Sequence, residues 1–173
     1  MPTPEFVLKL REKIGHDLLW LNGVTGCVLD EQGRILLGRR SDTGEWAMVY
    51  GINEPGEQPA DTVVREIKEE TGVDAIVTDL VAVTSSDKVI TYANGDNTMY
   101  MDHSFLCALK PGGNSEPFVG DEESLNVGWF DTNALPEPLA ASTVERLALF
   151  RRYLENKRHG DAHALFQFDG VQY

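Results

Sequence analysis

The stretch Gly51–Val73, GINEPGEQPADTVVREIKEETGV, constrains this chain more than any other, because it specifies a loop that runs into an acidic helix. Glu54–Gly56 has the composition of a turn. Pro59 suits the first turn of a helix, where its missing N–H costs nothing. Gly72 has the usual place of a helix stop. Between them the apolar residues recur at helical spacing: Val63, Val64 and Ile67. The pattern predicts a helix that ends at Thr71-Gly72.

The other side of this predicted helix carries Glu66, Glu69 and Glu70, which point into one wedge of roughly 100°. Carboxylates at these spacings repel one another, and a hard divalent cation with oxygen ligands would offset the repulsion. Arg65 and Glu57 are placed to orient the cluster as a second layer of contacts. The alternative is a solvated acidic face whose early acids complement the helix dipole.

The complete pattern decides between these interpretations. Gly51 is followed by five residues and Glu57, and seven more residues lead to Arg65–Val73, REIKEETGV. This arrangement resembles the complete Nudix box, with Ile67 and Val73 at the aliphatic positions. It covers 23 of the 173 residues, and so many fixed positions rarely coincide by chance.

The resemblance implies a fold of the α/β (α+β) class, an α/β/α sandwich with a mixed β-sheet between helices. It also implies hydrolysis of a nucleoside diphosphate linked to another group, with Mg²⁺ or Mn²⁺ as cofactor and water attack at phosphorus. Carried over by position, the metal ligands are Glu66, Glu69 and Glu70, the orienting pair is Arg65 and Glu57, and the loop glycine is Gly51.

Just before the box the chain departs from the common family pattern, since Val49-Tyr50 stands where many members have Pro-Gly. A backbone carbonyl of this loop often joins the metal shell in the family, and Tyr50 can offer its own. Glycine would adopt unusual backbone angles more freely. The departure therefore keeps a second hypothesis open, a nucleotide- or metal-binding module with little or no turnover.

Candidates outside the box are weaker. Arg39 and Arg40 either contact substrate phosphates, for which the arginine fork is suited, or form a solvated strand end. Trp46 continues the resemblance as part of a Gly-x-Trp pattern. We expect its ring to pack in the core rather than to stack on a nucleobase. The resemblance also places a glutamate ahead of the later Trp-containing strand. Glu122 and Glu123 are the candidates, as a further metal ligand or as the base, with Glu123 preferred and Glu66 the alternative base.

The rest of the chain predicts ordinary elements around this stretch. An amphipathic helix over 4–14 lies within an N-terminal segment 1–15, and a C-terminal helix over about 142–157 begins with a capping box, Ser142-x-x-Glu145. Its buried side is predicted to include Val144. Phe166 and Phe168 in the tail 159–173 are expected to pack on the domain or on a second subunit. Predicted strands span 24–29, 34–38, 73–83, 88–92, 98–109 and 127–130, with an Asn94-Gly95 hairpin.

Composition limits the function classes. A length of 173 residues suits one domain, 1–173, and a net charge of −13 disfavours attraction to nucleic-acid polymers or anionic membranes. Cys27 and Cys107 lie in apolar runs and are expected to be buried free thiols. No signal pattern or membrane span is apparent, so a cytoplasmic location is the default expectation. We expect a monomer or homodimer that acts on a small nucleotide, either a nucleoside triphosphate or an ADP-ribose-like compound.

Overall fold

The structure is a computed structural model that describes residues 3–173, so residues 1 and 2 of the predicted N-terminal segment lie outside it. The helices are α1 (Glu5–Ile14), α2 (Pro59–Thr71) and α3 (Ala141–Arg158). The strands are β1 (Leu19–Leu29), β2 (Ile35–Arg40), β3 (Trp46–Ala47), β4 (Val49–Ile52), β5 (Ala75–Ser85), β6 (Ile90–Thr91), β7 (Asn97–Leu109), β8 (Ser124–Phe130), β9 (Gln167–Phe168) and β10 (Val171–Gln172).

The centre of the fold is an eight-stranded sheet whose main path has the order β3-β2-β1-β7-β5. β4 also pairs with β1, β6 with β7, and β8 with β2. The long central strands β1 and β7 run parallel from the pair Leu19↔Thr98 to the pair Leu29↔Ala108. The flanking pairs, such as β1 with β4 and β5 with β7, are antiparallel. The predicted mixed sheet is therefore confirmed.

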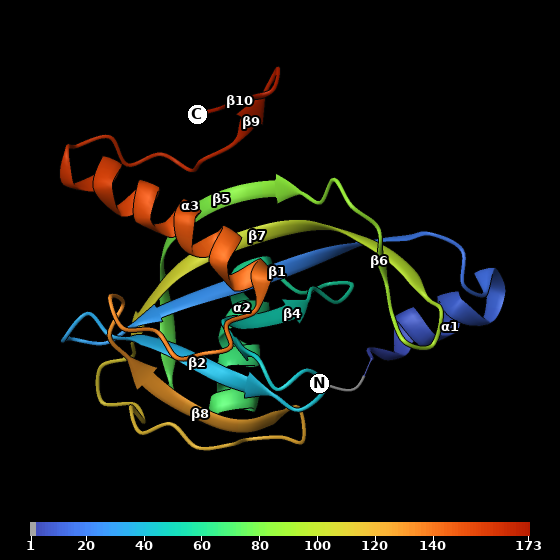
Figure 1. The fold of residues 1–173 in the computed structure, drawn as a ribbon, viewed down its shortest axis with the longest axis horizontal. Coiled ribbons are helices and arrows are strands. Elements are labelled where there is room, and N and C mark those ends of the chain that lie inside the picture. Colours follow the sequence, from blue (N-terminus) through green and yellow to red (C-terminus); the bar gives the residue numbers. More distant parts are fainter. Residues whose placement is uncertain (1–2) are drawn as a thin grey trace.

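Helices cover both faces of this sheet (Figure 1), as the packing of alternate residues in β2 shows. Ile35 and Leu37 belong to the cluster that contains Phe150 of α3. Leu36, which points to the opposite face, packs in the cluster that contains Ile67 of α2. Two hydrophobic cores thus lie on the two sides of one sheet, which confirms the α/β/α sandwich.

Strand boundaries differ from the prediction where pairing, not local pattern, decides them. β1 begins at Leu19 rather than 24, because it continues along its parallel partner β7. The Asn94-Gly95 hairpin is confirmed by the antiparallel pairs Ile90↔Thr98 and Thr91↔Asn97, although its first arm has only two residues. β8 begins at Ser124, three positions before the predicted start, since Ser124 pairs with Arg40 of β2.

The start of α3 corrects one prediction. The N-cap is Ala140 and it makes no side-chain capping bond, so the capping box at Ser142 is wrong. Ser142 is the second residue of the helix, and its hydroxyl oxygen is 3.2 Å from the Tyr50 hydroxyl oxygen. Val144, predicted to be buried, is 54% exposed, while Tyr153 is buried in the core.

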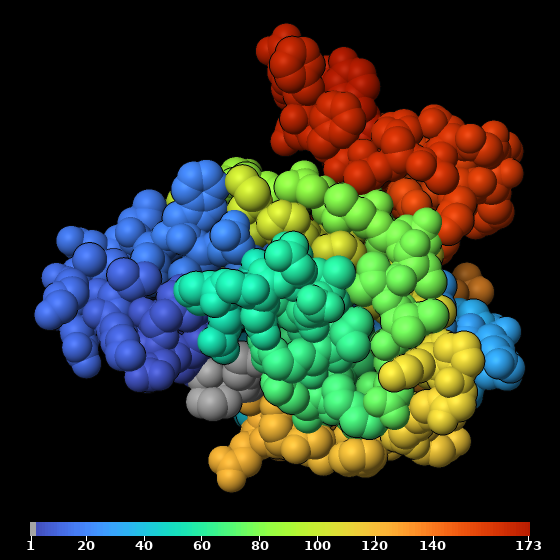
Figure 2. All heavy atoms as spheres, turned by 180° about the vertical axis from the view of Figure 1, so that it is seen from behind, coloured from blue at the N-terminus to red at the C-terminus, as the bar shows by residue number. Residues whose placement is uncertain are grey.

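The tail packs through a different residue from those expected. Leu165 is fully buried and forms a parallel bridge with Ala82 of β5. Phe168 is 68% exposed, so packing of this side chain on its own domain is wrong. The short β9–β10 hairpin projects from the body in Figure 2, where it is coloured red. Packing of this hairpin on a second subunit stays a prediction.

Two smaller predictions also have outcomes. Cys27 and Cys107 are free and buried, as expected, and burial raises the pKa of both thiols, that of Cys107 to about 12. Across residues 3–173, none of the helices has the length and apolar character needed to cross a membrane.

Candidate active site

The entrance of α2 holds an ion pair between Arg65 and Glu57. The Arg65 Nε and Nη2 groups donate to the two Glu57 carboxylate oxygens at 2.9 and 3.0 Å. Thr62 Oγ1 also donates to Glu57 Oε2, at 2.9 Å. These bonds, above all those from Arg65, lower the pKa of Glu57 to about 2. The two residues predicted to orient the acidic cluster are thus in direct contact, and Glu57 stays ionised.

The remaining Arg65 nitrogen contacts two of the predicted metal ligands. Nη1 donates to Glu66 Oε1 at 3.1 Å and to Glu69 Oε2 at 3.0 Å. Glu66 is fully buried, whereas the Glu69 side chain is 47% exposed. Burial raises the pKa of Glu66 to about 7, and the nearby Arg65 charge opposes this rise. Within the described residues, Glu66 Oε2 is a buried carboxylate oxygen with no hydrogen-bond partner.

Gly51 lies in strand β4, not in a loop as the sequence suggested, and Glu66 packs directly against it. β4 pairs with β1 through Val24↔Gly51 and Thr25↔Tyr50, which holds the strand under α2. A Cβ atom at position 51 would lie 2.5 Å from Glu66 Oε1, closer than real contacts allow. Glycine is therefore required at this position for Glu66 to approach the sheet.

The loop after β7 is fastened to the last carbonyl groups of α2. Phe118 N donates to Thr71 O at 2.9 Å, and Gly120 N donates to Glu70 O at 3.0 Å. Asn114 Nδ2 donates to Gly72 O at 2.9 Å. A side chain at position 120 would clash with the Glu69 carbonyl group, so only glycine allows this approach. The loop thus binds the C-terminal end of the acidic helix.

This attachment brings one further acidic residue, Asp121, close to Glu70. Burial raises the pKa of Glu70 to about 8, and the charges of Glu66 and Asp121 add to the rise. Asp121 did not emerge from the sequence as a site residue; its only signal was its place in the run Asp121–Glu123. Glu123 lines the same pocket as Glu70, whereas Glu122 is exposed and is not among the described residues that line it.

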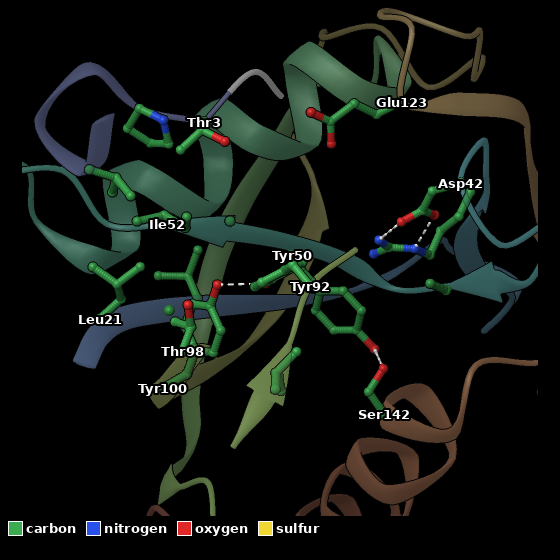
Figure 3. A pocket seen from close by; sticks show the side chains of 18 of the residues that line it. Thr3, Leu21, Asp42, Tyr50, Ile52, Tyr92, Thr98, Tyr100, Glu123 and Ser142 are labelled. Carbon is green, nitrogen blue, oxygen red and sulfur yellow. Dashed lines mark hydrogen bonds and ion pairs between the residues drawn. The ribbon is translucent and has the colours of Figure 1, made fainter. Parts of the chain in front are cut away.

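A pocket of about 730 Å³ extends from the acidic end of α2 to the start of α3. Figure 3 shows Glu123 on the α2 side and Ser142 on the α3 side, with Tyr50 between them. The predicted site residues that line the pocket are Arg40, Tyr50, Gly51, Glu70 and Glu123. Those that do not line it are Arg39, Trp46, Glu57, Arg65, Glu66, Glu69 and Glu122.

The upstream candidates have separate places. Arg40 faces the pocket and forms a two-bond ion pair with Asp42, at 2.6 and 2.9 Å. Arg39 is exposed, and its Nε donates to Gly44 O at 3.0 Å. Trp46 packs edge-on against Phe130, with ring centroids 4.7 Å apart. The geometry of Trp46 is that of a packing anchor, not of a base-stacking residue.

The α3 side of the pocket is built on Tyr50. The Tyr50 hydroxyl is 2.7 Å from Thr143 Oγ1 and 3.2 Å from Ser142 Oγ, and burial raises its pKa. The Arg146 guanidinium lies over the Tyr50 ring, with its central carbon 4.9 Å from the ring centroid. Contacts of this kind between a guanidinium and an aromatic face are attractive.

Asp102 of β7 completes this side. It is only 5% exposed and accepts hydrogen bonds from Thr25 Oγ1 and Ser104 Oγ, each at 2.7 Å. Arg146 Nη2 donates to Asp102 Oδ1 at 3.3 Å. Sequence reasoning missed both Asp102 and Arg146. β7 also carries Asn97, Thr98, His103 and Ser104, so an acidic residue at position 102 did not stand out from the sequence.

Comparison with known proteins agrees with this architecture. A family model for the NUDIX domain matches residues 20–152. A MutT-like protein of Streptomyces ambofaciens is 32% identical over 124 residues, which are 72% of this chain and 72% of that protein. The human 8-oxo-dGDP phosphatase NUDT18 is 29% identical over 160 residues, 90% of this chain and 45% of that protein. This chain therefore spans less than half the length of that human relative.

The fold is also found among solved structures. The crystal structure of a MutT NUDIX hydrolase from Burkholderia pseudomallei is similar with a TM-score of 0.58 and 28% identity. The similarity covers 76% of this chain and 97% of that one. The shared part therefore includes nearly all of the solved protein.

Proposed function

Because the chain belongs to the Nudix hydrolase family, we propose that it cleaves the phosphoanhydride bond of a nucleoside diphosphate linked to another group, with water attacking phosphorus. The observation that carries the proposal is the pair Glu66 and Glu70 on α2. Glu66 has a buried carboxylate oxygen with no hydrogen-bond partner in the part of the chain that the structure describes, and Glu70, one turn later on α2, lines the pocket. A buried oxygen left unpaired is costly unless a ligand or an ion completes it.

The residues at this end of the pocket fit a divalent cation. Within residues 3–173 the acidic, histidine and cysteine side chains form no ready-made group of three or more for a metal ion. Arg65 Nη1 instead bonds to both Glu66 and Glu69. Glu66 Oε2 nonetheless offers a free lone pair of the hard oxygen type that Mg²⁺ and Mn²⁺ accept. Glu66, Glu69 and Glu70 would hold the ion, and the Tyr50 carbonyl group is a further candidate ligand.

Nudix hydrolases generally use divalent metal ions, and such an ion supplies neutralisation of the diphosphate charge and activation of water. The protein's own contribution is positioning. Arg65 is held by Glu57 and in turn fixes Glu66 and Glu69. The carboxylate that takes the proton from water is either Glu66 or a glutamate of the loop before β8. Of the two loop glutamates we prefer Glu123, because it lines the pocket and Glu122 does not. Arg40 lies in the pocket wall and would contact the phosphates.

The pocket size supports a small nucleotide as substrate. A volume of about 730 Å³ falls within the range typical of sites for small molecules. Nucleoside triphosphates and ADP-ribose-like compounds both fit the proposed reaction. The relatives include proteins named for 8-oxo-dGDP and, as a putative activity, for ADP-ribose.

A second candidate function is a binding module that turns over slowly or not at all. Two observations favour it: Val49-Tyr50 replaces the usual Pro-Gly, and among residues 3–173 the acidic side chains are not gathered into a metal-binding group. Such a module would bind nucleotides saturably without releasing phosphate products.

The test is a panel of nucleoside triphosphates, ADP-ribose, NADH and dinucleoside polyphosphates incubated with Mg²⁺ or Mn²⁺, with products separated by chromatography. We expect metal-dependent cleavage of one class, and its loss in Glu70→Gln by at least about a hundredfold, since even residues behind metal ligands cost up to that much. Glu12→Gln, an exposed glutamate of α1, is the matched control. Full turnover by Glu70→Gln would overturn the site, and nucleotide binding without cleavage would establish the module.

A further inference from the structure

We propose that Arg146 binds the O6 and N7 atoms of a purine base, so that the pocket prefers 6-oxopurine nucleotides, such as those of guanine and hypoxanthine, over adenine nucleotides. The proposal rests on the proposed function only in taking a nucleotide as the occupant of the pocket. It assigns the α3 side of the pocket to the base and leaves the α2 side to the phosphates.

The first argument is the unused donors of Arg146. Its side chain lines the pocket and is 24% exposed. Nη2 donates to Asp102 Oδ1 at 3.3 Å, and Nη1 makes a long contact of 3.4 Å with Ser142 O. Each of these nitrogens carries two hydrogens. One N–H on each therefore remains for a ligand, and two neighbouring donors in one plane match two neighbouring acceptors.

The second argument is charge. The Asp102 carboxylate lies beside the guanidinium and balances its positive charge. A phosphate at this place would leave a partly buried negative charge without compensation, which is costly. A neutral acceptor edge adds no charge. The lining of the pocket as a whole also includes apolar and aromatic side chains that suit a flat neutral ring, among them Met48, Tyr92 and Tyr100.

The third argument separates the purines. Guanine presents two acceptors, O6 and N7, on one edge, whereas adenine presents N7 and an amino donor. The adenine amino group would face an Arg146 N–H group, donor against donor. Asp102 Oδ1 already accepts from Thr25 and Arg146, and Oδ2 accepts from Ser104, so only one further acceptor site, on Oδ2, remains on this carboxylate. The C6 carbonyl group is thus the feature that the pocket selects.

The experiment compares the binding of GMP, IMP and AMP by calorimetry without added metal, so that the base alone distinguishes the ligands. We expect the wild-type protein to bind GMP and IMP at least about tenfold more tightly than AMP, within the range for a two-bond arginine–base contact. Arg146→Gln should lose this preference through weaker GMP and IMP binding. Arg151→Gln changes an exposed arginine of the same helix and should behave as wild type. Arg146→Lys keeps the charge without the fork and should lose most of the preference.

The outcomes are distinguishable from those of the hydrolysis assay. A wild-type protein that binds AMP as tightly as GMP would overturn the assignment, as would equal loss of all three ligands in folded Arg146→Gln and Arg146→Lys proteins. A wild-type protein that prefers GMP but hydrolyses nothing would contradict the proposed function and leave Arg146 as the base-reading residue. In an active enzyme, Arg146→Gln should raise KM for GTP and ITP with little change in kcat, while KM for ATP stays the same.

Discussion

The two sides of the pocket are built by contacts of very different range along the chain. On the α2 side, Arg65 contacts residues that are one, four and eight positions away. On the α3 side, the Tyr50–Thr143 contact joins residues 93 positions apart, and the Thr25–Asp102 contact spans 77. The acidic residues of the first side lie on one helix and its entrance, and Gly51 of β4 and Gly120 of the loop after β7 pack against this helix. The second exists only when β1, β4, β7 and α3 are assembled.

The two kinds of contact coincide with the two proposed roles, hydrolysis on the α2 side and recognition of the base on the α3 side. The three glutamates proposed to hold a metal ion lie on one helix, which sets their spacing, while the approach of Glu66 to the sheet depends on Gly51 of β4. Arg146, proposed to contact the base, lies on α3, and the two residues that hold its guanidinium, Tyr50 and Asp102, come from β4 and β7. We therefore expect substitutions at Gly51 and at the glutamates of α2 to reduce turnover more than stability, and a substitution at Asp102 to reduce stability more than turnover.

The largest effect should come from Gly51→Ala, because the added Cβ would lie 2.5 Å from Glu66 Oε1. Glu66 must then move, and misplacement of a reacting group by about 1 Å can cost on the order of a hundredfold in rate. Steady-state kinetics measures this loss. Gly128→Ala in β8 is the control, since its nearest neighbour would be 3.4 Å away, an ordinary contact. Equal activity of the two variants would contradict the close approach of Glu66 to β4.

On the α3 side, Asp102→Asn should lower the free energy of unfolding by about 3 kcal/mol, because the Arg146 charge loses its buried partner. Urea denaturation measures the change. The exposed Asp131→Asn, which keeps an acceptor for the Asn133 amide, should change stability by less than about 0.5 kcal/mol. A loss in Asp102→Asn no larger than that of the control would break the distinction between the two sides.

Glu57→Gln should lower the free energy of unfolding by about 2 kcal/mol at pH 7, through loss of its charged bonds with Arg65. The pKa of Glu57 falls from 4.5 to about 2 on folding, so its stabilisation is complete above pH 4.5 and is lost as pH falls toward 2. The difference between wild type and variant should therefore shrink between about pH 5 and pH 2. A difference that is constant over this range in chemical denaturation would contradict the ion pair.

The smallest effect should follow Tyr50→Phe, which removes the hydroxyl contacts with Thr143 and Ser142 and keeps the ring under Arg146. The expected loss is about 1 kcal/mol in the free energy of unfolding. Thermal denaturation beside the exposed Tyr173→Phe measures it. A loss above about 3 kcal/mol would show that the hydroxyl supports more of the α3 side than these two contacts.

Sequence reasoning succeeded where the signal was local. Pro59 and Gly72 gave the bounds of α2, and the Asn94-Gly95 pair gave the β6–β7 hairpin. It failed where a distant partner decided the outcome. The Ser142 capping box was plausible by spacing, but in the fold this hydroxyl lies near Tyr50. Asp102 and Arg146 carried no pattern at all, because they meet only through the parallel register of β1 and β7 and the packing of α3.

The attachment of the loop to the end of α2 has a consequence for protein engineering. Asn114, Phe118 and Gly120 bond in turn to Gly72, Thr71 and Glu70, so the spacing of this segment follows the spacing of three helix carbonyl groups. An inserted or deleted residue between 114 and 120 would break this correspondence, shift Asp121 away from Glu70 and move Glu123 from its place in the pocket wall. Length changes at Gly112, in the preceding turn, would leave it intact. Loop grafts intended to alter this protein should therefore begin and end before Asn114.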